Sequence, residues 1–265
     1  MIRSSSAPPL KSQISCPLAG FEPAAERSQT RLWSPKSGPN VPPRRWGCGI
    51  APRAFRRVGF PIIAFFVRRL VSIRVEGLEN LEGLTGPAIF AATHESKIDA
   101  FVLLTALPSR WRYRMAITMG DWVFWQGWFG GRRVQTARYN AMVFAGNVFT
   151  LAPNSAGLRG ALRHIQFLAA HGWSILVFPE GMHSPWLLPF QAGPGWMAHH
   201  TGLPVVPVYI DGMAGVLPRD ARVARRGAIG IRIGKPIRPD GVDFRALAER
   251  IEQHVHALRS AAYSS

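Results

Sequence analysis

Short apolar runs recur along the chain from about residue 74 and alternate with longer stretches of helical periodicity. A continuous apolar run of this length, bounded by turn residues, is typical of a strand buried on both faces of a sheet. We therefore predict four buried strands, in "PAIFAAT" (87–93), "YRMAITM" (113–119), "WSILVF" (173–178) and "PVVPVYI" (204–210). In "IGIRIG" (229–234) isoleucine alternates with other residues, which predicts a strand with one exposed face.

The last periodic segment, residues 243 to 258, predicts an amphipathic helix with Asp243 as its N-terminal cap. Its apolar face consists of Phe244, Leu247, Ile251, Val255 and Leu258. Strands that alternate with helices along a chain are typical of helices packed on a sheet. We therefore predict an α/β fold with a mixed, largely parallel sheet flanked by helices.

Residues 1–55 are rich in Ser, Pro, Gly and Arg and show no hydrophobic periodicity. Such a segment buries too little apolar area to offset the entropy lost on ordering. We expect a disordered basic leader here, followed by one domain over residues 56–265. The leader has no apolar core of a secretory signal, and its acid-poor composition is weakly similar to an organellar transit peptide or to an over-long predicted start.

The segment "VGFPIIAFFVRRLVSI" (58–73) is apolar, but Arg68 and Arg69 interrupt it after ten residues. A bilayer-spanning helix needs about 20 apolar residues. One interpretation is an N-terminal interfacial helix, with the arginines at the lipid head groups and an apolar face below them. That face would consist of Ile62, Ile63, Phe65 and Phe66. The alternative, a helix packed on its own domain, stays open.

A second aromatic segment, "DWVFWQGWF" (121–129), spaces Trp122, Trp125 and Trp128 three residues apart. This stripe fits either a core helix or an aromatic anchor at the membrane boundary, where indole rings accumulate.

The formal net charge is +17, with 32 Lys and Arg against 15 Asp and Glu. Positive potential attracts nucleic acids, anionic membranes and polyanionic small molecules alike. The basic residues are mostly scattered arginines without zinc-ligand spacing or a recognition motif, so we expect no nucleic-acid partner. Both cysteines, Cys16 and Cys48, lie in the leader, which excludes a disulfide, a cysteine metal site or a cysteine nucleophile in the domain.

Candidate chemistry appears first in "AATHESKIDAF" (91–101). In one interpretation Ser96 and Asp99 form a capping box at a helix start, which leaves His94 without a role. In the other, His94 stands at the carboxyl end of a strand and Asp99, in the first turn of the next helix, faces back to it. Ligands bind at such strand ends, and an imidazole held by a carboxylate is a competent general base.

A second charged corner follows the strand at 173–178, where Pro179, Glu180 and Gly181 predict a sharp turn. Glu180 would then lie at the same kind of strand end as His94.

The motifs "HESKID", "FPEG" and "VVPVYI", in this order, resemble those of the glycerolipid or lysophospholipid acyltransferases, of the type that acylates 1-acylglycerol-3-phosphate. The lead-in "VEGLENL" and the stretch "LLPFQAGPGWMAHHTGLP" are also similar to this family. The resemblance covers about residues 70 to 240.

This resemblance implies transfer of a fatty acyl group from acyl-CoA or acyl carrier protein to a hydroxyl of a lipid acceptor, of lysophospholipid or glycerol-phosphate type. It gives His94 the role of general base and Asp99 that of orienting it. The acceptor site would include Ser96, Glu180, Gly181 and His183. It implies no metal and no bound cofactor. Because the acyl chains of the acceptor reside in the membrane, the basic domain, the segment 58–73 and the tryptophan stripe together predict a peripheral membrane protein on the cytoplasmic face. Direct attack without an acyl-enzyme agrees with the lack of a Gly-x-Ser-x-Gly motif.

Three basic positions of the family pattern are missing. Its middle block ends in arginine, where this chain has Ala152 and Pro153; Thr-Arg-Ser after FPEG is replaced by Met-His-Ser; and Gln191 and Ala192 stand where lysines are common. Phosphate recognition depends on such charge-assisted contacts. The acceptor therefore stays open, and so does whether arginines from another loop take over. The candidates are Arg132, Arg133 and Arg138.

Two other classes of function stay in competition. The missing basic residues prompt the first, a catalytically lapsed lipid-binding or regulatory member of the same fold. The second is a serine or thiol hydrolase, which the missing nucleophile motif argues against.

Overall fold

The computed structural model describes residues 43–120, 132–151, 155–218, 221 and 223–262. The expected tryptophan stripe, Ala152, Pro153 and the first 42 residues of the leader lie outside this part of the chain.

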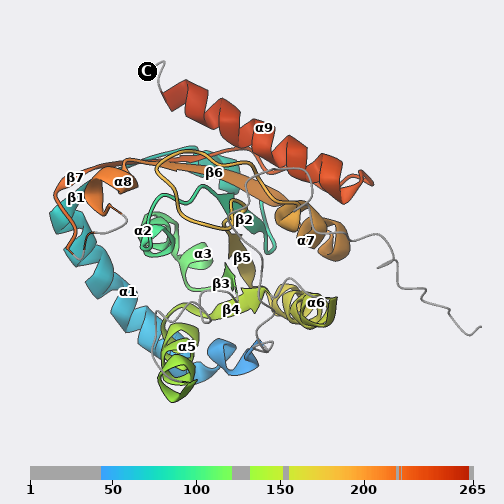
Figure 1. Cartoon of the computed structure of the whole chain (residues 1–265), viewed down its shortest axis with the longest axis horizontal. Coiled ribbons are helices and arrows are strands. Elements are labelled where there is room, and N and C mark those ends of the chain that lie inside the picture. The colour runs from blue at the N-terminus through green and yellow to red at the C-terminus, as the bar shows by residue number, and fades with distance from the viewer. Residues whose placement is uncertain (1–42, 121–131, 152–154, 219–220, 222, 263–265) are drawn as a thin grey trace, which may run out of the picture.

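The described residues form a seven-stranded sheet in the order β1-β7-β6-β2-β5-β3-β4 (Figure 1). The strands are β1 (Val71–Glu76), β2 (Ile89–Ala92), β3 (Met115–Gly120), β4 (Val148–Leu151), β5 (Ser174–Val177), β6 (Val205–Asp211) and β7 (Gly227–Ile233). Strands β6, β2, β5, β3 and β4 pair in parallel, β7 is antiparallel to β6, and β1 is parallel to β7. The predicted mixed, largely parallel sheet is confirmed.

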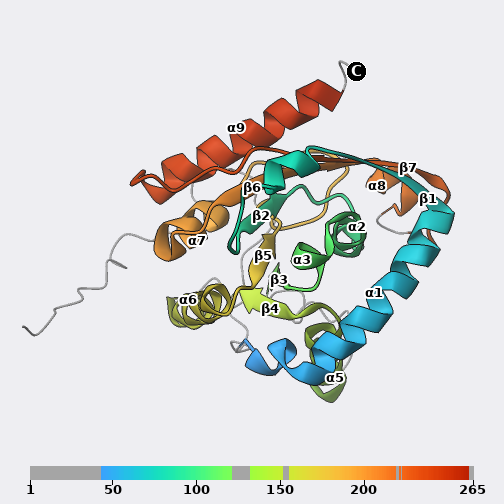
Figure 2. The ribbon, with the colours of Figure 1, turned by 180° about the vertical axis from the view of Figure 1, so that it is seen from behind.

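Helices cover both faces of the sheet (Figures 1 and 2). On one face lie α1 (Ile50–Leu70), α2 (Asp99–Ala106), α3 (Ser109–Arg112) and α5 (Arg132–Gly146). On the other lie α6 (Ser155–Ala170), α7 (Gly193–Thr201) and α9 (Phe244–Ala262). The short elements are η2 (Arg45–Cys48), η3 (Leu78–Leu81) and α8 (Met213–Val216).

Each face of the sheet has its own hydrophobic core, and successive residues of a strand enter them in turn. In β5, Leu176 belongs to the core under α2, whereas Ile175 and Val177 belong to the core under α6 and α7. This two-sided burial explains why β2, β5 and β6 are continuous apolar runs in the sequence. In β7 the alternating isoleucines, Ile229, Ile231 and Ile233, are the buried positions, as predicted.

Helix α1 begins at Ile50 and ends at Leu70, so it starts before the expected segment 58–73, whose last residues belong to β1. One face of α1 is buried through Arg56, Phe60 and Ala64. The other exposes large apolar side chains, namely Phe55, Val58, Ile62, Ile63, Phe65 and Phe66. The buried face confirms that the helix packs on its own domain, and the interfacial helix stays a prediction for the exposed face. Within the described residues, no helix combines the length and apolarity needed to cross a bilayer.

The segment from residue 43 to α1 folds onto the domain, although we expected residues 1–55 to be a disordered leader. The Arg56 guanidinium, 3% exposed, donates to the carbonyl oxygens of Gly47 at 2.7 Å and Phe144 at 3.0 Å. It also lies over the ring of Trp173, 5.5 Å from its centroid. Through Arg56, α1 is thus joined to η2, to the end of α5 and to the residue before β5.

Candidate active site

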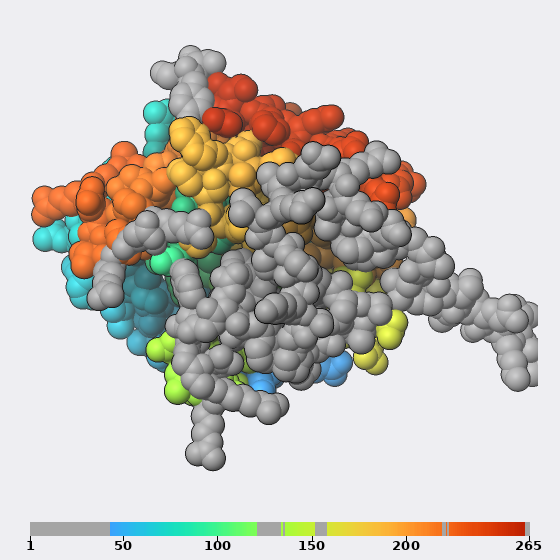
Figure 3. Space-filling view, in the orientation of Figure 1, coloured from blue at the N-terminus to red at the C-terminus, as the bar shows by residue number. Residues whose placement is uncertain are grey.

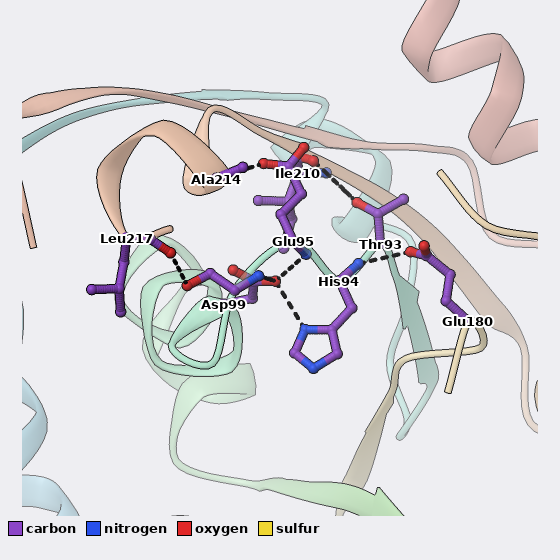
Figure 4. Close-up of polar contacts among 9 residues, drawn as sticks. Thr93, His94, Glu95, Asp99, Glu180, Ile210, Ala214 and Leu217 are labelled. Atoms are coloured by element: carbon purple, nitrogen blue, oxygen red, sulfur yellow. Dashed lines mark hydrogen bonds and ion pairs between the residues drawn. The ribbon is translucent and has the colours of Figure 1, made fainter. Parts of the chain in front are cut away.

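His94 and Asp99 meet at the corner where β2 passes into α2. Strand β2 ends at Ala92, and α2 begins with Asp99 in its first turn. The His94 Nδ1–H donates to Asp99 Oδ2 at 2.9 Å (Figure 4). The carboxylate is fully buried, while the imidazole is 20% exposed. The two side chains face each other because the corner, and not one regular helix, separates them.

The same Asp99 oxygen also accepts the backbone N–H groups of Glu95 at 2.7 Å and Ser96 at 2.8 Å. Half of the predicted capping box is therefore present together with the His94 pair. The other half is absent in this corner, because the Ser96 hydroxyl donates to the Leu217 carbonyl at 3.1 Å. Ser96 is 1% exposed, and its hydroxyl bonds the corner to the residue that follows α8; its predicted contact with the lipid acceptor stays a prediction.

Two rings fix the orientation of the imidazole. Phe178 stacks on His94 with centroids 4.1 Å apart, and His183 lies edge-on at 5.6 Å. The second ring nitrogen of His94 points away from Asp99 (Figure 4). Phe178 was missed by the sequence analysis; its place at the end of the β5 run, just before Pro179, is the available signal.

Glu180 joins the two charged corners that the sequence analysis treated separately. Its Oε1 accepts the His94 backbone N–H at 2.8 Å, and its Oε2 accepts the Leu188 N–H at 2.9 Å. The turn that presents it has a hydrogen bond from Gly181 N–H to the Phe178 carbonyl at 3.1 Å and a φ of 74° at Gly181. That backbone conformation favours glycine.

Glu180 is 5% exposed, and burial raises its pKa to about 7. The two amide hydrogen bonds favour the ionised form and offset part of this, whereas the negative charges of Asp99 and Glu95 add to it. Because its two oxygens bond to backbone N–H groups, Glu180 stabilises the positions of His94 and Leu188.

Glu95 is a member of the site that the sequence analysis missed, although it adjoins His94. Its Oε2 accepts the Ala214 N–H at the start of α8, at 3.1 Å (Figure 4). Burial raises its pKa to about 7, with a smaller contribution from the charge of Asp99. The corner is therefore bonded to α8 through Glu95 and to the following loop through Ser96.

All six predicted site residues lie at one edge of the sheet, namely His94, Ser96, Asp99, Glu180, Gly181 and His183. The segment after FPEG is bonded to the same corner, because the Ser184 N–H donates to the His94 carbonyl at 2.8 Å. Of the alternative arginines, Arg138 is exposed on α5, and the side chains of Arg132 and Arg133 are outside the described set. The described residues contain no cluster of three His, Cys, Asp or Glu side chains suited to a metal ion. An imidazole with one nitrogen on a buried carboxylate can take a proton at the other.

Comparisons with known proteins show the family to which the chain belongs. A family model described as Acyltransferase matches residues 72–211, which include β1 to β6 and both charged corners. The chain belongs to the acyltransferase family. The resemblance noted in the sequence is thereby confirmed at the level of the family.

Individual acyltransferases of this family are distant relatives. The chloroplastic 1-acyl-sn-glycerol-3-phosphate acyltransferase BAT2 of Brassica napus is 29% identical over 167 residues, which are 62% of this chain and 44% of that protein. The 1-acyl-sn-glycerol-3-phosphate acyltransferase of Saccharomyces cerevisiae is 25% identical over 203 residues, 73% of this chain and 62% of that protein. The chain thus spans less than two thirds of either relative.

A solved structure shares the fold. The crystal structure of the 1-acyl-sn-glycerophosphate acyltransferase PlsC from Thermotoga maritima superposes with a TM-score of 0.56 at 24% identity, covering 80% of this chain and 85% of PlsC. At this identity the likeness concerns the fold alone.

Proposed function

We propose that this acyltransferase moves a fatty acyl group from acyl-CoA or acyl carrier protein to a hydroxyl of a lipid acceptor, of lysophospholipid or glycerol-phosphate type. The observation that carries the proposal is the 2.9 Å hydrogen bond between His94 Nδ1 and the buried Asp99 carboxylate. The names of the plant and yeast relatives, which act on 1-acyl-sn-glycerol-3-phosphate, support the choice of acceptor class.

In the proposed reaction His94 is the general base and Asp99 its positioning residue. The acceptor hydroxyl gives its proton to His94 Nε2 while its oxygen attacks the thioester carbonyl carbon. The tetrahedral intermediate then collapses with cleavage of the carbon–sulfur bond, and the imidazolium returns the proton to the departing thiolate. The products are an ester and a free thiol. The Asp99 carboxylate stabilises the imidazolium, and the Phe178 face beside it does the same more weakly.

The remaining site residues have separate roles in this proposal. Glu180 and Gly181 hold the FPEG corner against His94. His183 contacts the acceptor in this proposal, which its ring 5.6 Å from that of His94 supports. The reaction as written needs no metal or bound cofactor.

A lipid acceptor requires contact with a membrane surface, and we place the protein as a peripheral protein on the cytoplasmic face. The exposed apolar face of α1 supports this placement. Its side chains are 37 to 62% exposed at Ile62, Ile63, Phe65 and Phe66, and Arg68 and Arg69 follow directly. Such a helix fits the head-group boundary of a bilayer.

The test is an acceptor panel with the purified full chain. Incubation with palmitoyl-CoA should release free thiol only when a lysophospholipid or glycerol 3-phosphate is added, and mass spectrometry should show one additional acyl ester on the acceptor. Tight lipid binding without thiol release from any donor would instead favour the lapsed, lipid-binding function. An acyl-enzyme in the absence of acceptor would contradict direct attack.

A further inference from the structure

A groove at the end of α1 is not used by the proposed reaction. It has a volume of about 520 Å³ and is lined by Phe66, Arg69 and Leu70 of α1 together with Arg226, which precedes β7. Ligand sites of small molecules and head groups occupy several hundred Å³. The groove therefore has room for a phosphate with its glycerol.

The sheet register brings these residues together although they are far apart in the sequence. Val71, the first residue of β1, pairs with Gly227, the first residue of β7. Leu70 and Arg226 directly precede this pair, so the helix end and the loop end meet side by side. Figure 3 shows the surface of α1, in blue and cyan, next to the orange surface of the segment between β6 and β7.

The lining combines two kinds of chemistry. Arg69 and Arg226 are both exposed, and neither forms an ion pair with a residue that the structure describes. Phe66 and Leu70 are 61% and 44% exposed beside them. Guanidinium groups bind phosphate oxygens through charge-assisted hydrogen bonds, while exposed aromatic and aliphatic side chains favour the acyl region of a bilayer. A ligand that satisfies both is a phospholipid.

The groove also lies at the same edge of the sheet as His94. Asp211, at the end of β6, pairs with Gly230, so the start of β7 extends beyond the carboxyl end of β6. Strand β2 is parallel to β6 and leads to His94 at that same end. A bilayer that contacts the groove would therefore face the edge that carries the catalytic corner.

One loop joins the groove to that corner. It starts at Leu217, whose carbonyl accepts the Ser96 hydroxyl, and it ends at Arg226. Near its far end the Arg225 N–H donates to the Val216 carbonyl at 2.7 Å, which holds Arg225 beside the end of α8.

We propose that the groove formed by Phe66, Arg69, Leu70 and Arg226 binds the phosphate-bearing head group of an anionic membrane phospholipid and turns the His94 edge of the sheet toward the bilayer. The bound lipid is a constituent of the membrane surface and not the acceptor. Binding of a phospholipid in the groove does not depend on the proposed function. Only its benefit does, because it would present a lipid hydroxyl to His94.

The test measures binding of the full chain to vesicles without any acyl donor. Vesicle binding therefore tests the groove separately from the thiol-release assay, which tests the proposed reaction. Vesicles of phosphatidylcholine alone are compared with vesicles that also contain phosphatidylglycerol. The variant R69Q/R226Q removes both groove charges. The matched control R245Q/R250Q removes two exposed arginines from α9, on the other face of the sheet.

An arginine near an anionic lipid surface is worth about five-fold in binding, so R69Q/R226Q should weaken binding to the anionic vesicles by roughly 25-fold. The control should change it by less than about three-fold, and F66S should weaken binding to both vesicle types. Equal binding of R69Q/R226Q and its control would overturn the proposal, because the effect would then be one of net charge. If the wild type binds inorganic phosphate and R69Q/R226Q does not, while both bind the anionic vesicles equally, the groove takes a soluble ligand and the proposal is also overturned.

Discussion

Replacing Asp99 by asparagine removes one charge from the His94 corner and keeps the shape of the side chain. Asp99 Oδ2 accepts three hydrogen bonds, from His94, Glu95 and Ser96, and an amide oxygen at that place can accept the same three. The other oxygen is buried and has no hydrogen-bond partner among the described residues, so the new NH₂ group would lie there unpaired. That costs about 1–3 kcal/mol of stability.

The effect on the rate should be larger than the effect on stability. Two unit charges at roughly 3 Å interact by about 5 kcal/mol at an effective dielectric constant of about 20. This attraction exists only when His94 has taken the proton, so its loss raises the barrier of the chemical step. Allowing for the partial dipole of the amide, we expect kcat to fall by a factor of about 10² to 10⁴, equivalent to about 3 to 5 kcal/mol.

The assay is thiol release from palmitoyl-CoA at saturating acceptor, with urea unfolding of the same preparation as the test of folding. Asp240→Asn is the control, because Asp240 is exposed in the loop before α9. A D99N variant that unfolds like the wild type and keeps kcat within about three-fold would refute the role of Asp99.

Three further predictions concern stability. Burial raises the pKa of both Glu180 and Glu95 from 4.5 to about 7, so the folded state binds their protons more tightly, and this contribution to stability is complete below pH 4.5 and lost as the pH rises through 7. Unfolding by urea at pH 5 and pH 8 should show a loss of up to about 3 kcal/mol from each of the two carboxyl groups, and E180Q should remove the share of Glu180. An undiminished loss in E180Q would contradict this origin. Gly195→Ala should destabilise by about 1–3 kcal/mol, because its Cβ would overlap the Phe244 carbonyl oxygen and lie 2.9 Å from the Ala248 nitrogen, both in α9; an unchanged melting temperature would show that α9 shifts freely. Arg56→Met should cost about 2–4 kcal/mol in urea unfolding, because two carbonyl groups inside the fold lose their donor, and a neutral result would mean that water replaces it.

The sequence was sufficient to predict those parts of the fold that depend on local pattern. Strands β2, β5 and β6 are buried on both faces, so each is a continuous apolar run between turn residues. The His94 and Asp99 pair was also predictable, because a strand end and a helix start are separated by only a few residues. Both partners belong to one motif.

Other features depend on contacts between distant parts of the chain. Glu180 accepts the His94 N–H across 86 residues. The sequence therefore predicts a charged turn at Glu180, but not the hydrogen bond that joins this turn to the His94 corner. Arg56 reaches the Phe144 carbonyl across 88 residues, so the order of the segment before α1 depends on a contact that local sequence pattern does not reveal. The boundary between α1 and β1 was missed because one apolar run contains the end of the helix and the start of the strand.

The most direct test of the account is the rate of acyl transfer by His94→Asn. The asparagine NH₂ can replace the His94 Nδ1–H as donor to Asp99, so the corner keeps its hydrogen bond and loses only the nitrogen that would take the proton. The matched control is His254→Asn on α9, where Nδ1 likewise bonds an oxygen, the Arg250 carbonyl at 2.8 Å. If His94 is the general base, H94N retains native urea unfolding, its kcat for thiol release falls at least about 10³-fold, and H254N keeps the wild-type rate. A folded H94N variant with a rate within about ten-fold of the wild type would contradict this role of His94.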